Sequence, residues 1–203
     1  MSVLNVNRSA SHSFSKPSVS SITLIPNLGV EDDAHAGATV KHRSRLHINP
    51  APPNLRQVHL IHSEILASAS RGDVMILPGE LGENITTTGI DLLALGRGTK
   101  LRFVSSGGGV GGVGGVVGNP GSGDHASDAA VAEVTVTGLR NPCPQIDRFR
   151  KGLKEKFIVR DGDGQIIGRR AGIMGIVEQG GEVRPGMRIV VEKPTVHEPL
   201  ECV

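Results

Sequence analysis

The residues best suited to chemistry lie in the segment GLRNPCPQID, residues 138–147. Cys143 stands between two prolines, and Arg140 and Asn141 come shortly before it. Proline restricts the backbone and removes an N–H donor, while a nearby guanidinium favours the thiolate form of a cysteine. A free cysteine also occurs as a small apolar side chain in a core. From these residues alone, Cys143 is either a core residue or a reactive thiol, and the thiol would serve as a nucleophile, a sulfur carrier or a ligand of a soft metal.

A second group of candidate residues is a histidine-rich stretch that contains His35, His42, His47, His59 and His62. No H-E-x-x-H pattern and no paired cysteines accompany these histidines. Two interpretations therefore stay open: a zinc site assembled through space, or solvated loop histidines. The DAHAG motif at 33–37 adjoins a basic segment, and we interpret this part of the chain as facing an anion.

Two glycine-rich stretches resemble ligand-binding loops but lack their defining features. Residues 105–128 match G-x-G-x-x-G, yet no helix follows to present its N-terminus to a phosphate. Glycine at this density is costly to order, so we interpret 105–128 as a low-complexity hairpin insertion. DGDGQIIG at 161–168 lacks the glycine at position six and the glutamate at position twelve of a calcium loop. We interpret it as an acidic turn.

Length and composition exclude several classes of protein. The 203 residues suit one domain, and a net charge of +2 with 2% aromatic residues disfavours general binding to nucleic acid. Two cysteines cannot form a disulfide framework, so we expect a reducing, cytoplasmic setting. No apolar run has the length of a membrane span, so we expect no membrane partner. The alternating start SVLNVN favours a first strand over a cleaved signal.

The chain must position these residues mainly with strands. Alternating apolar residues predict strands at 2–7, 20–25, 55–61, 98–104 and 129–139. We predict a short helix at 62–70 with Ser63 as its N-cap, and a helical pattern at 144–157. Short strands joined by tight turns indicate a mainly β fold, a closed β-barrel with a few short helices.

Six segments resemble one known family in their order along the chain: GVEDDAHAG, RQVHLIHSE, PGELGENITTTGIDLLAL, VTGLRNPCPQIDRF, RAGIMGIV and GGEVRPGMRIVVE. Together they resemble the MOSC domain family, named for the C-terminal domain of molybdenum-cofactor sulfurase. The likeness is to small stand-alone members that confer resistance to N-hydroxylated base analogues. It implies a single MOSC domain over residues 1–203, with an insertion at 105–128 and a C-terminal tail at 195–203.

The resemblance also implies a site for the molybdenum cofactor, a pyranopterin that carries Mo. In amidoxime-reducing members of the family, one cysteine is a ligand of Mo, and in sulfurase-linked members it is proposed to carry sulfur. This family cysteine corresponds to Cys143. Forked, charged donors suit phosphate groups and pterin edges. We therefore expect cofactor contacts from His35, Arg43, Asn84, Arg140 and Asn141, with Arg45 also available to the phosphate.

The function implied by the resemblance is reduction of small N-hydroxylated compounds, such as hydroxylamino-purines and amidoximes. The chain contains no flavin, haem or iron–sulfur motif, so the electrons would come from a separate reductase. The alternative is a sulfur carrier that holds a Cys143 persulfide for cofactor sulfuration or metal–sulfur cluster assembly. It would need a separate cysteine desulfurase, which would bring the pyridoxal phosphate. The resemblance is also compatible with a homodimer, although the sequence shows no interface.

Two positions depart from the family pattern. Asp32 stands where the family often has a glycine, which indicates a backbone with positive φ. Asp tolerates that conformation better than most residues do, so we expect the loop to persist. Cys202 has no counterpart in the family, and we interpret it as an exposed thiol of the C-terminal tail.

Overall fold

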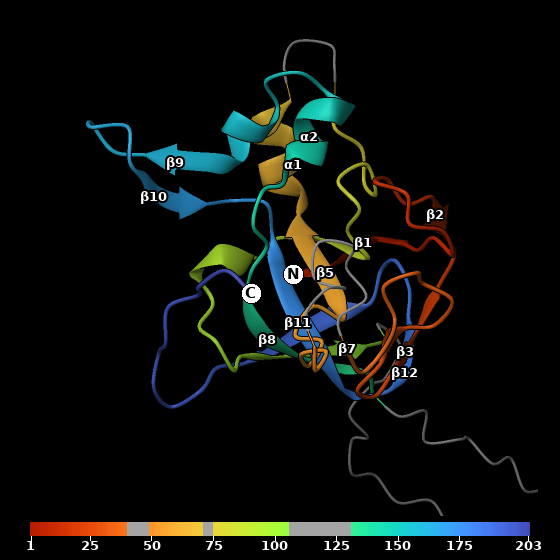
Figure 1. Cartoon of the computed structure of the whole chain (residues 1–203). Helices are drawn as coiled ribbons and strands as arrows, with labels where there is room; N and C mark the ends of the chain where they lie inside the picture. The colour runs from red at the N-terminus through yellow and green to blue at the C-terminus, as the bar shows by residue number, and fades with distance from the viewer. Residues whose placement is uncertain (40–48, 71–74, 106–130) are drawn as a thin grey trace, which may run out of the picture.

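The chain forms a closed barrel of seven strands beside a small helical region (Figure 1). A computed structural model describes residues 1–39, 49–70, 75–105 and 131–203. In barrel order the strands are β13 (Arg188–Glu192), β7 (Lys100–Val104), β8 (Glu133–Leu139), β11 (Ile173–Gln179), β5 (Val58–His62), β6 (Ile85–Thr88) and β1 (Ser2–Asn7). A pairing between Ser2 and Arg188 closes the ring. The predicted mainly β, closed barrel is confirmed.

Neighbouring strands of the barrel are antiparallel except β5 and β6. Parallel neighbours require a crossover connection, and the chain between β5 and β6 contains helix α1 (Ser63–Ala69). Smaller strand pairings accompany the barrel. They are β2 (Ser18–Val19) on β1, the sheet of β12 (Gly181–Val183), β3 (Ile22–Ile25) and β4 (Gly29–Val30), and the hairpin of β9 (Ile158–Arg160) and β10 (Ile166–Arg169).

Two apolar cores follow from this arrangement. The barrel core contains alternate residues of the strands, such as Leu101 and Phe103 of β7. A second core packs under α1 and α2 (Pro144–Phe149) and includes Ile65, Ile146 and Phe157. Figure 1 shows both helices beyond one end of the barrel, with the β9–β10 hairpin projecting beside them.

Both predicted helices occur at the predicted places, but their bounds and the predicted N-cap are wrong. Helix α1 begins after His62, so Ser63 is the first helical residue and not the N-cap. The pattern at 144–157 does not form one helix, because α2 ends at Phe149 and a 3-10 turn, η3 (Lys154–Phe157), follows. Gly152 lies between them with a φ of 77°, a left-handed conformation that an α-helix does not contain.

The remaining segment predictions have mixed outcomes. The predicted acidic turn at 161–168 is shorter, because residues 161–165 join β9 to β10 and 166–168 belong to β10. Asp161 accepts hydrogen bonds from the backbone N–H groups of Asp163 and Gln165. The segment at 77–95 mixes turns with β6 and the 3-10 turn η2 (Leu92–Ala94). The predicted insertion at 105–128 lies outside the described residues, apart from Ser105. Among the helices that the structure describes, none is long and apolar enough to cross a membrane.

Candidate functional site

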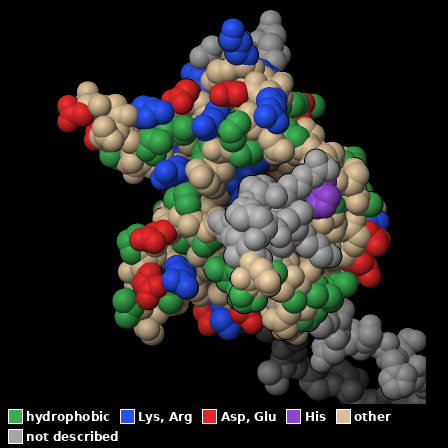
Figure 2. All heavy atoms as spheres, in the orientation of Figure 1, with side chains coloured by type: hydrophobic (Ala, Val, Ile, Leu, Met, Phe, Trp, Pro, Cys, Tyr) green, Lys and Arg blue, Asp and Glu red, His purple; other side chains and the backbone are tan. Residues whose placement is uncertain are grey.

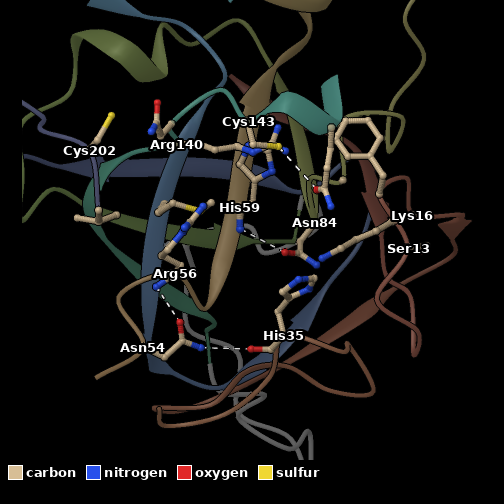
Figure 3. A pocket seen from close by; sticks show the side chains of 16 residues that line it. Ser13, Lys16, His35, Asn54, Arg56, His59, Asn84, Arg140, Cys143 and Cys202 are labelled. Carbon is tan, nitrogen blue, oxygen red and sulfur yellow. Dashed lines mark hydrogen bonds between the residues drawn. The ribbon is translucent and has the colours of Figure 1, made fainter. Parts of the chain in front are cut away.

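One cavity gathers the chemistry-bearing residues of the barrel and the helical region. Its volume is about 460 Å³, within the range of small-molecule sites. Figure 3 shows its wall, to which separate parts of the chain contribute. The lining residues are Ser13, Phe14, Lys16, His35, Asn54, Arg56, His59, Gly82, Asn84, Arg140, Asn141, Cys143, Gln145, Met174, Cys202 and Val203.

Cys143 occupies the N-cap of α2 at the wall of this cavity. Pro144 is the first residue of α2, a position that suits its fixed φ and missing N–H. A residue before proline is restricted to extended conformations, and Cys143 has a φ of −95° and a ψ of 164°. Its half-buried thiol lies 3.7 Å from Gln145 Oε1. The prolines thus decide where the sulfur lies.

Arg140 has a buried charge that the described residues leave incompletely paired. Its side chain lines the cavity, yet only 8% of the residue is exposed. Its Nη1 atom has no hydrogen-bond partner among the described residues. Burial lowers the pKa of this guanidinium, while Cys143 and Glu83 partly oppose that shift. A buried N–H without an acceptor costs free energy, so this wall of the cavity fits a ligand that provides an acceptor.

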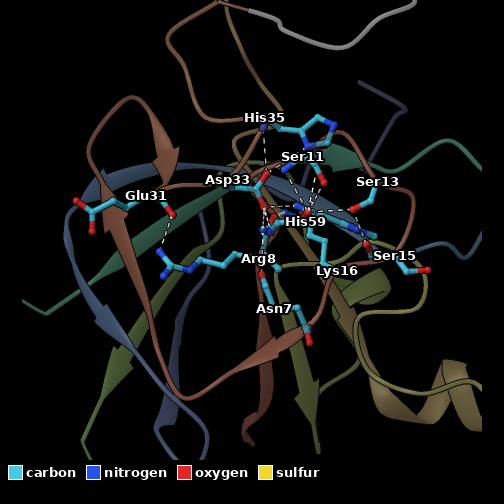
Figure 4. Close-up of polar contacts among 12 residues, drawn as sticks. Asn7, Arg8, Ser11, Ser13, Ser15, Lys16, Glu31, Asp33, His35 and His59 are labelled. Carbon is cyan, nitrogen blue, oxygen red and sulfur yellow. Dashed lines mark hydrogen bonds and ion pairs between the residues drawn. The ribbon is translucent and has the colours of Figure 1, made fainter.

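A polar network forms another part of the wall (Figure 4). Asp33 Oδ2 lies 2.7 Å from Lys16 Nζ, and Asp33 Oδ1 lies 3.2 Å from His35 Nδ1. Asn84 Nδ2 donates to Asp33 Oδ2 at 3.0 Å. Burial opposes ionisation of Asp33, but the contacts with His35 and Lys16 outweigh it and hold the pKa of this carboxyl well below its usual range. Asp33 is therefore an ionised carboxylate.

The GEN motif at residues 82–84 has a mainly structural role in this network. Glu83 is fully buried, and its Oε1 accepts from Gly79 N at 2.6 Å and from Thr86 Oγ1 at 2.9 Å. Burial raises the pKa of this carboxyl. Asn84 lines the cavity, but its Oδ1 also accepts from His59 N at 3.2 Å. The amide group of Asn84 therefore joins the network to β5.

His59 is a buried lining residue on β5. Its Nε2 lies 2.8 Å from Ala171 O. Burial, followed by the positive charge of Arg140, lowers the pKa of this imidazole well below its usual value. His59 is therefore neutral, and it donates from Nε2 because a carbonyl oxygen only accepts.

The structure brings together five of the six predicted site residues. They are Cys143, His35, Asn84, Arg140 and Asn141, all on the wall of the cavity. Asn141 is exposed, and its Oδ1 accepts from Arg169 Nε at 3.2 Å. Arg43, and with it Arg45, lies outside the described residues.

Three lining residues with reactive or charged groups were not predicted as site residues: Lys16, Arg56 and Cys202. His59 was named only as a member of the histidine-rich stretch, without a role at the cavity. Lys16 carried almost no signal, because it is one of two basic residues in a serine-rich stretch. Only long-range packing places its ammonium group beside Asp33.

The interpretation of Cys202 as an exposed thiol of the C-terminal tail is confirmed, and the structure adds a position at the cavity. The tail runs beside the end of β8, where Leu139 N donates to Glu201 O at 2.7 Å and Val203 N donates to Leu139 O at 3.3 Å. Gly138 permits this approach, since a Cβ atom there would lie 2.3 Å from Glu201 O. Burial raises the pKa of the Cys202 thiol.

Two further expectations concern backbone conformation and zinc. Asp32 has a φ of 56°, so the predicted left-handed conformation is confirmed. Its carboxylate pairs with Arg8 Nη1 at 3.0 Å. As for zinc, no cluster of three His, Cys, Asp or Glu side chains that could hold a metal ion occurs in the part of the chain that the structure describes.

Comparisons with known proteins identify the fold. No model of a known family matches the sequence, and no curated protein sequence matches it. The crystal structure of the YUAD protein from Bacillus subtilis is 23% identical, covers 96% of each chain and has a TM-score of 0.68. YiiM from Escherichia coli is 14% identical over 98% of this chain and 73% of that chain, with a TM-score of 0.55. YiiM from Geobacillus stearothermophilus is 16% identical over 96% of this chain and 75% of that chain, with a TM-score of 0.53. The chain therefore has a MOSC-like fold.

Proposed function

We propose that this protein binds a molybdenum cofactor and reduces small N-hydroxylated compounds, such as hydroxylamino-purines and amidoximes. One observation carries the proposal: Cys143 lines the same cavity as Arg140, whose buried guanidinium keeps an unpartnered Nη1 among the described residues. A thiol is a suitable ligand for a soft metal. A guanidinium without an acceptor suits an anionic group. The cofactor combines a metal with an anionic pterin, and so it meets both requirements.

The donor set of the cavity fits this cofactor. Lys16 and Arg140 place two buried cations at the wall, and Arg56 adds a third cation there. In this proposal Cys143 holds Mo, Arg140 binds an anionic part of the pterin, and Asn141 contacts its edge. The neutral imidazole of His59 closes the wall without adding charge. When bound, the cofactor supplies the two-electron redox chemistry.

The electrons come from a separate reductase in this proposal. Residues 144–170 contain eight Lys and Arg against four Asp and Glu. Figure 2 shows many Lys and Arg side chains on the part of the molecule that carries α1 and α2. In residues 144–170, Arg148, Lys151 and Lys156 are exposed. Helix α2 follows Cys143 directly, so this basic surface favours an acidic donor that docks near the thiol.

Metal analysis tests the proposal, with the second cysteine as a matched control. Wild type, Cys143→Ala and Cys202→Ala are produced in a host that makes the cofactor. We expect molybdenum in wild type and Cys202→Ala and at least a tenfold lower content in Cys143→Ala. Reduction of a hydroxylamino-purine by reduced wild type should follow the metal content. Equal molybdenum in all three proteins would refute the ligand role of Cys143.

A second candidate function, sulfur transfer, is favoured by the presence of Cys202 in the same cavity. In this alternative, Cys143 accepts a sulfur atom as a persulfide from a cysteine desulfurase, which uses pyridoxal phosphate. Mass spectrometry after incubation with a desulfurase and cysteine would detect an addition of about 32 Da, one sulfur atom, on Cys143. If this addition is absent while molybdenum is bound, the reductase is favoured.

A further inference from the structure

The side chain of Lys16 places a buried ammonium group on the wall of the cavity. Its Nζ lies 2.7 Å from Asp33 Oδ2, and the two side chains are only 5% and 3% exposed. Lys16 lines the same cavity as Cys143. An ammonium group has three N–H donors, and the contact with Asp33 Oδ2 uses one of them.

We propose that Lys16 donates a proton to the oxygen that leaves the N-hydroxylated substrate, and that Asp33 and His35 connect Lys16 to solvent. This inference rests on the proposed reductase function and deepens it. It assigns to the chain itself one of the two protons that the reduction consumes. It also explains why a lysine with a carboxylate partner is buried at the cavity that Cys143 lines.

The balance of the reaction shows where this proton goes. Reduction of R–NH–OH breaks the N–O bond, consumes two electrons and two protons, and yields R–NH2 and water. The separate reductase supplies the electrons. The Lys16 ammonium gives one proton to the departing oxygen and becomes a neutral amine, and the second proton comes from solvent. A proton that enters at His35 and crosses the cavity, which both side chains line, then restores the ammonium, while Asp33 stays a carboxylate that orients both groups.

The surroundings of Lys16 favour proton donation. Burial lowers the pKa of its ammonium group, Asp33 partly restores it, and Arg140 lowers it further. Glu83 also faces Lys16 and raises its pKa, and His59 is the remaining titratable neighbour. A proton donor works best when its pKa lies near the operating pH. The direction of the shift therefore suits the assigned role.

His35 provides the connection to solvent. Its Nδ1 lies 3.2 Å from Asp33 Oδ1, and 33% of its side chain is exposed. Its ring also packs edge-on against the ring of His12, with centroids 5.1 Å apart. An imidazole can accept a proton at one ring nitrogen and release one from the other. His35, Asp33 and Lys16 thus form a continuous path from the exposed side of His35 to the cavity.

A purely structural role for the Lys16 side chain is the competing explanation. Backbone contacts already hold this segment, since Lys16 N donates to Gly79 O at 2.9 Å and Arg8 N donates to Pro17 O at 3.3 Å. The two explanations predict different results for Lys16→Arg. Arginine keeps the cation and the ion pair, but its guanidinium does not release a proton in proteins.

The first experiment compares wild type with Lys16→Arg, Lys16→Met and the exposed control Lys193→Arg, each loaded with cofactor and reduced chemically. We expect similar molybdenum contents in wild type, Lys16→Arg and Lys193→Arg, which all keep the cation at both positions. Turnover of a hydroxylamino-purine should fall by roughly 10²–10⁴-fold in both Lys16 variants, as for loss of a general acid, and remain unchanged in Lys193→Arg. The solvent isotope effect on kcat should increase in both Lys16 variants. Wild-type turnover in Lys16→Arg would overturn the proposal.

Two further measurements separate this inference from the proposed function. Imidazole added to His35→Ala should restore part of a lowered turnover, and unchanged turnover in His35→Ala would overturn the path to solvent. In cofactor-free protein, ¹⁵N NMR of lysine ammonium groups should place the Lys16 pKa below those of exposed lysines and lower still in Asp33→Asn. An ordinary Lys16 pKa would overturn the inference. Absent molybdenum or turnover in wild type would instead refute the proposed function.

Discussion

Two parts of the cavity wall differ in how completely the protein satisfies its own polar groups. The network wall consists of Lys16, His35 and Asn84, and each of these side chains contacts the carboxylate of Asp33. The open wall consists of Arg140, Asn141 and Cys143. There, Arg140 Nη1 has no partner within the described part of the chain. Buried polar groups normally find partners, so the network wall contributes to folding, whereas the open wall is arranged for a ligand.

The difference has a physical origin in how each wall is built. The network wall joins distant segments, since Lys16 precedes β2, Asp33 follows β4 and Asn84 precedes β6. Its contacts therefore hold the fold together. The open wall lies in one short segment between β8 and α2, where two prolines hold the backbone. That segment can leave a donor unpaired because its position does not depend on that donor.

The largest expected effect is loss of stability in Asp33→Ala. This change leaves the Lys16 charge buried without its partner, and removal of one member of a buried pair costs about 3–5 kcal/mol. Denaturant unfolding would measure the loss. Asp32→Asn is the control, because Asn tolerates the positive φ of this position while the exposed pair with Arg8 is lost, and such pairs contribute about 0–1 kcal/mol. Similar losses in the two variants would remove the distinction between the walls.

Gly138→Ala should release the C-terminal tail from the open side of the cavity. The added Cβ would lie 2.3 Å from Glu201 O and 2.8 Å from Val203 Cγ1, and backbone cannot yield to such a contact as a flexible side chain can. We expect Cys202 to react with a thiol reagent several-fold faster, with Cys143→Ser present in both proteins so that one thiol is observed. An unchanged rate would show that the tail contact is not needed to hold Cys202.

Arg140→Met should separate ligand binding from folding. The substitution removes a desolvated charge and an unpaired donor, both of which cost free energy in the folded chain. We expect the free energy of unfolding of cofactor-free protein to change by less than about 1 kcal/mol, while molybdenum content falls at least tenfold. A large loss of stability with normal metal content would make the open wall structural.

At acidic pH, the free energy of unfolding should depend on the ionisation of Asp33. The pKa of Asp33 is lower in the folded chain than in the unfolded one. Its contribution to stability is therefore complete above the ordinary Asp value of about 3.9 and declines as pH falls below it. Denaturant unfolding from pH 3 to pH 7 should show a constant difference between wild type and Asp33→Asn above about pH 5 and a shrinking difference below about pH 4. A constant difference from pH 3 to pH 7 would contradict the lowered pKa of Asp33 in the folded chain.

The smallest expected effect concerns the conformation of Asp32. Its φ of 56° suits glycine, so Asp32→Gly removes strain but also loses the pair with Arg8 and adds entropy to the unfolded chain. We expect a net change below about 1 kcal/mol. Asp32→Val should cost more, about 1–2 kcal/mol, because a β-branched residue is unfavourable in this conformation. Thermal unfolding of the two variants would test this order.

The sequence predicted the features that depend on local backbone chemistry. Alternation of apolar residues identified β1, β7 and β8, and the prolines around Cys143 indicated a held thiol. The position of Asp32, where the family often has glycine, indicated a left-handed conformation. The helix at 144–157 was predicted too long, because the apolar spacing continues across Gly152 although the backbone does not. Periodicity reports which face is buried but not whether the helix is continuous.

The sequence by itself determined a mainly β barrel, the likeness to the MOSC family and the position of Cys143 at a stiff turn. Only the tertiary structure decided that Lys16 pairs with Asp33, that Arg140 has an unpaired donor and that Cys202 lines the cavity. The reason is that strands and proline turns depend on neighbouring residues. Charge pairing and burial depend instead on which distant segments meet, and barrel closure decides that.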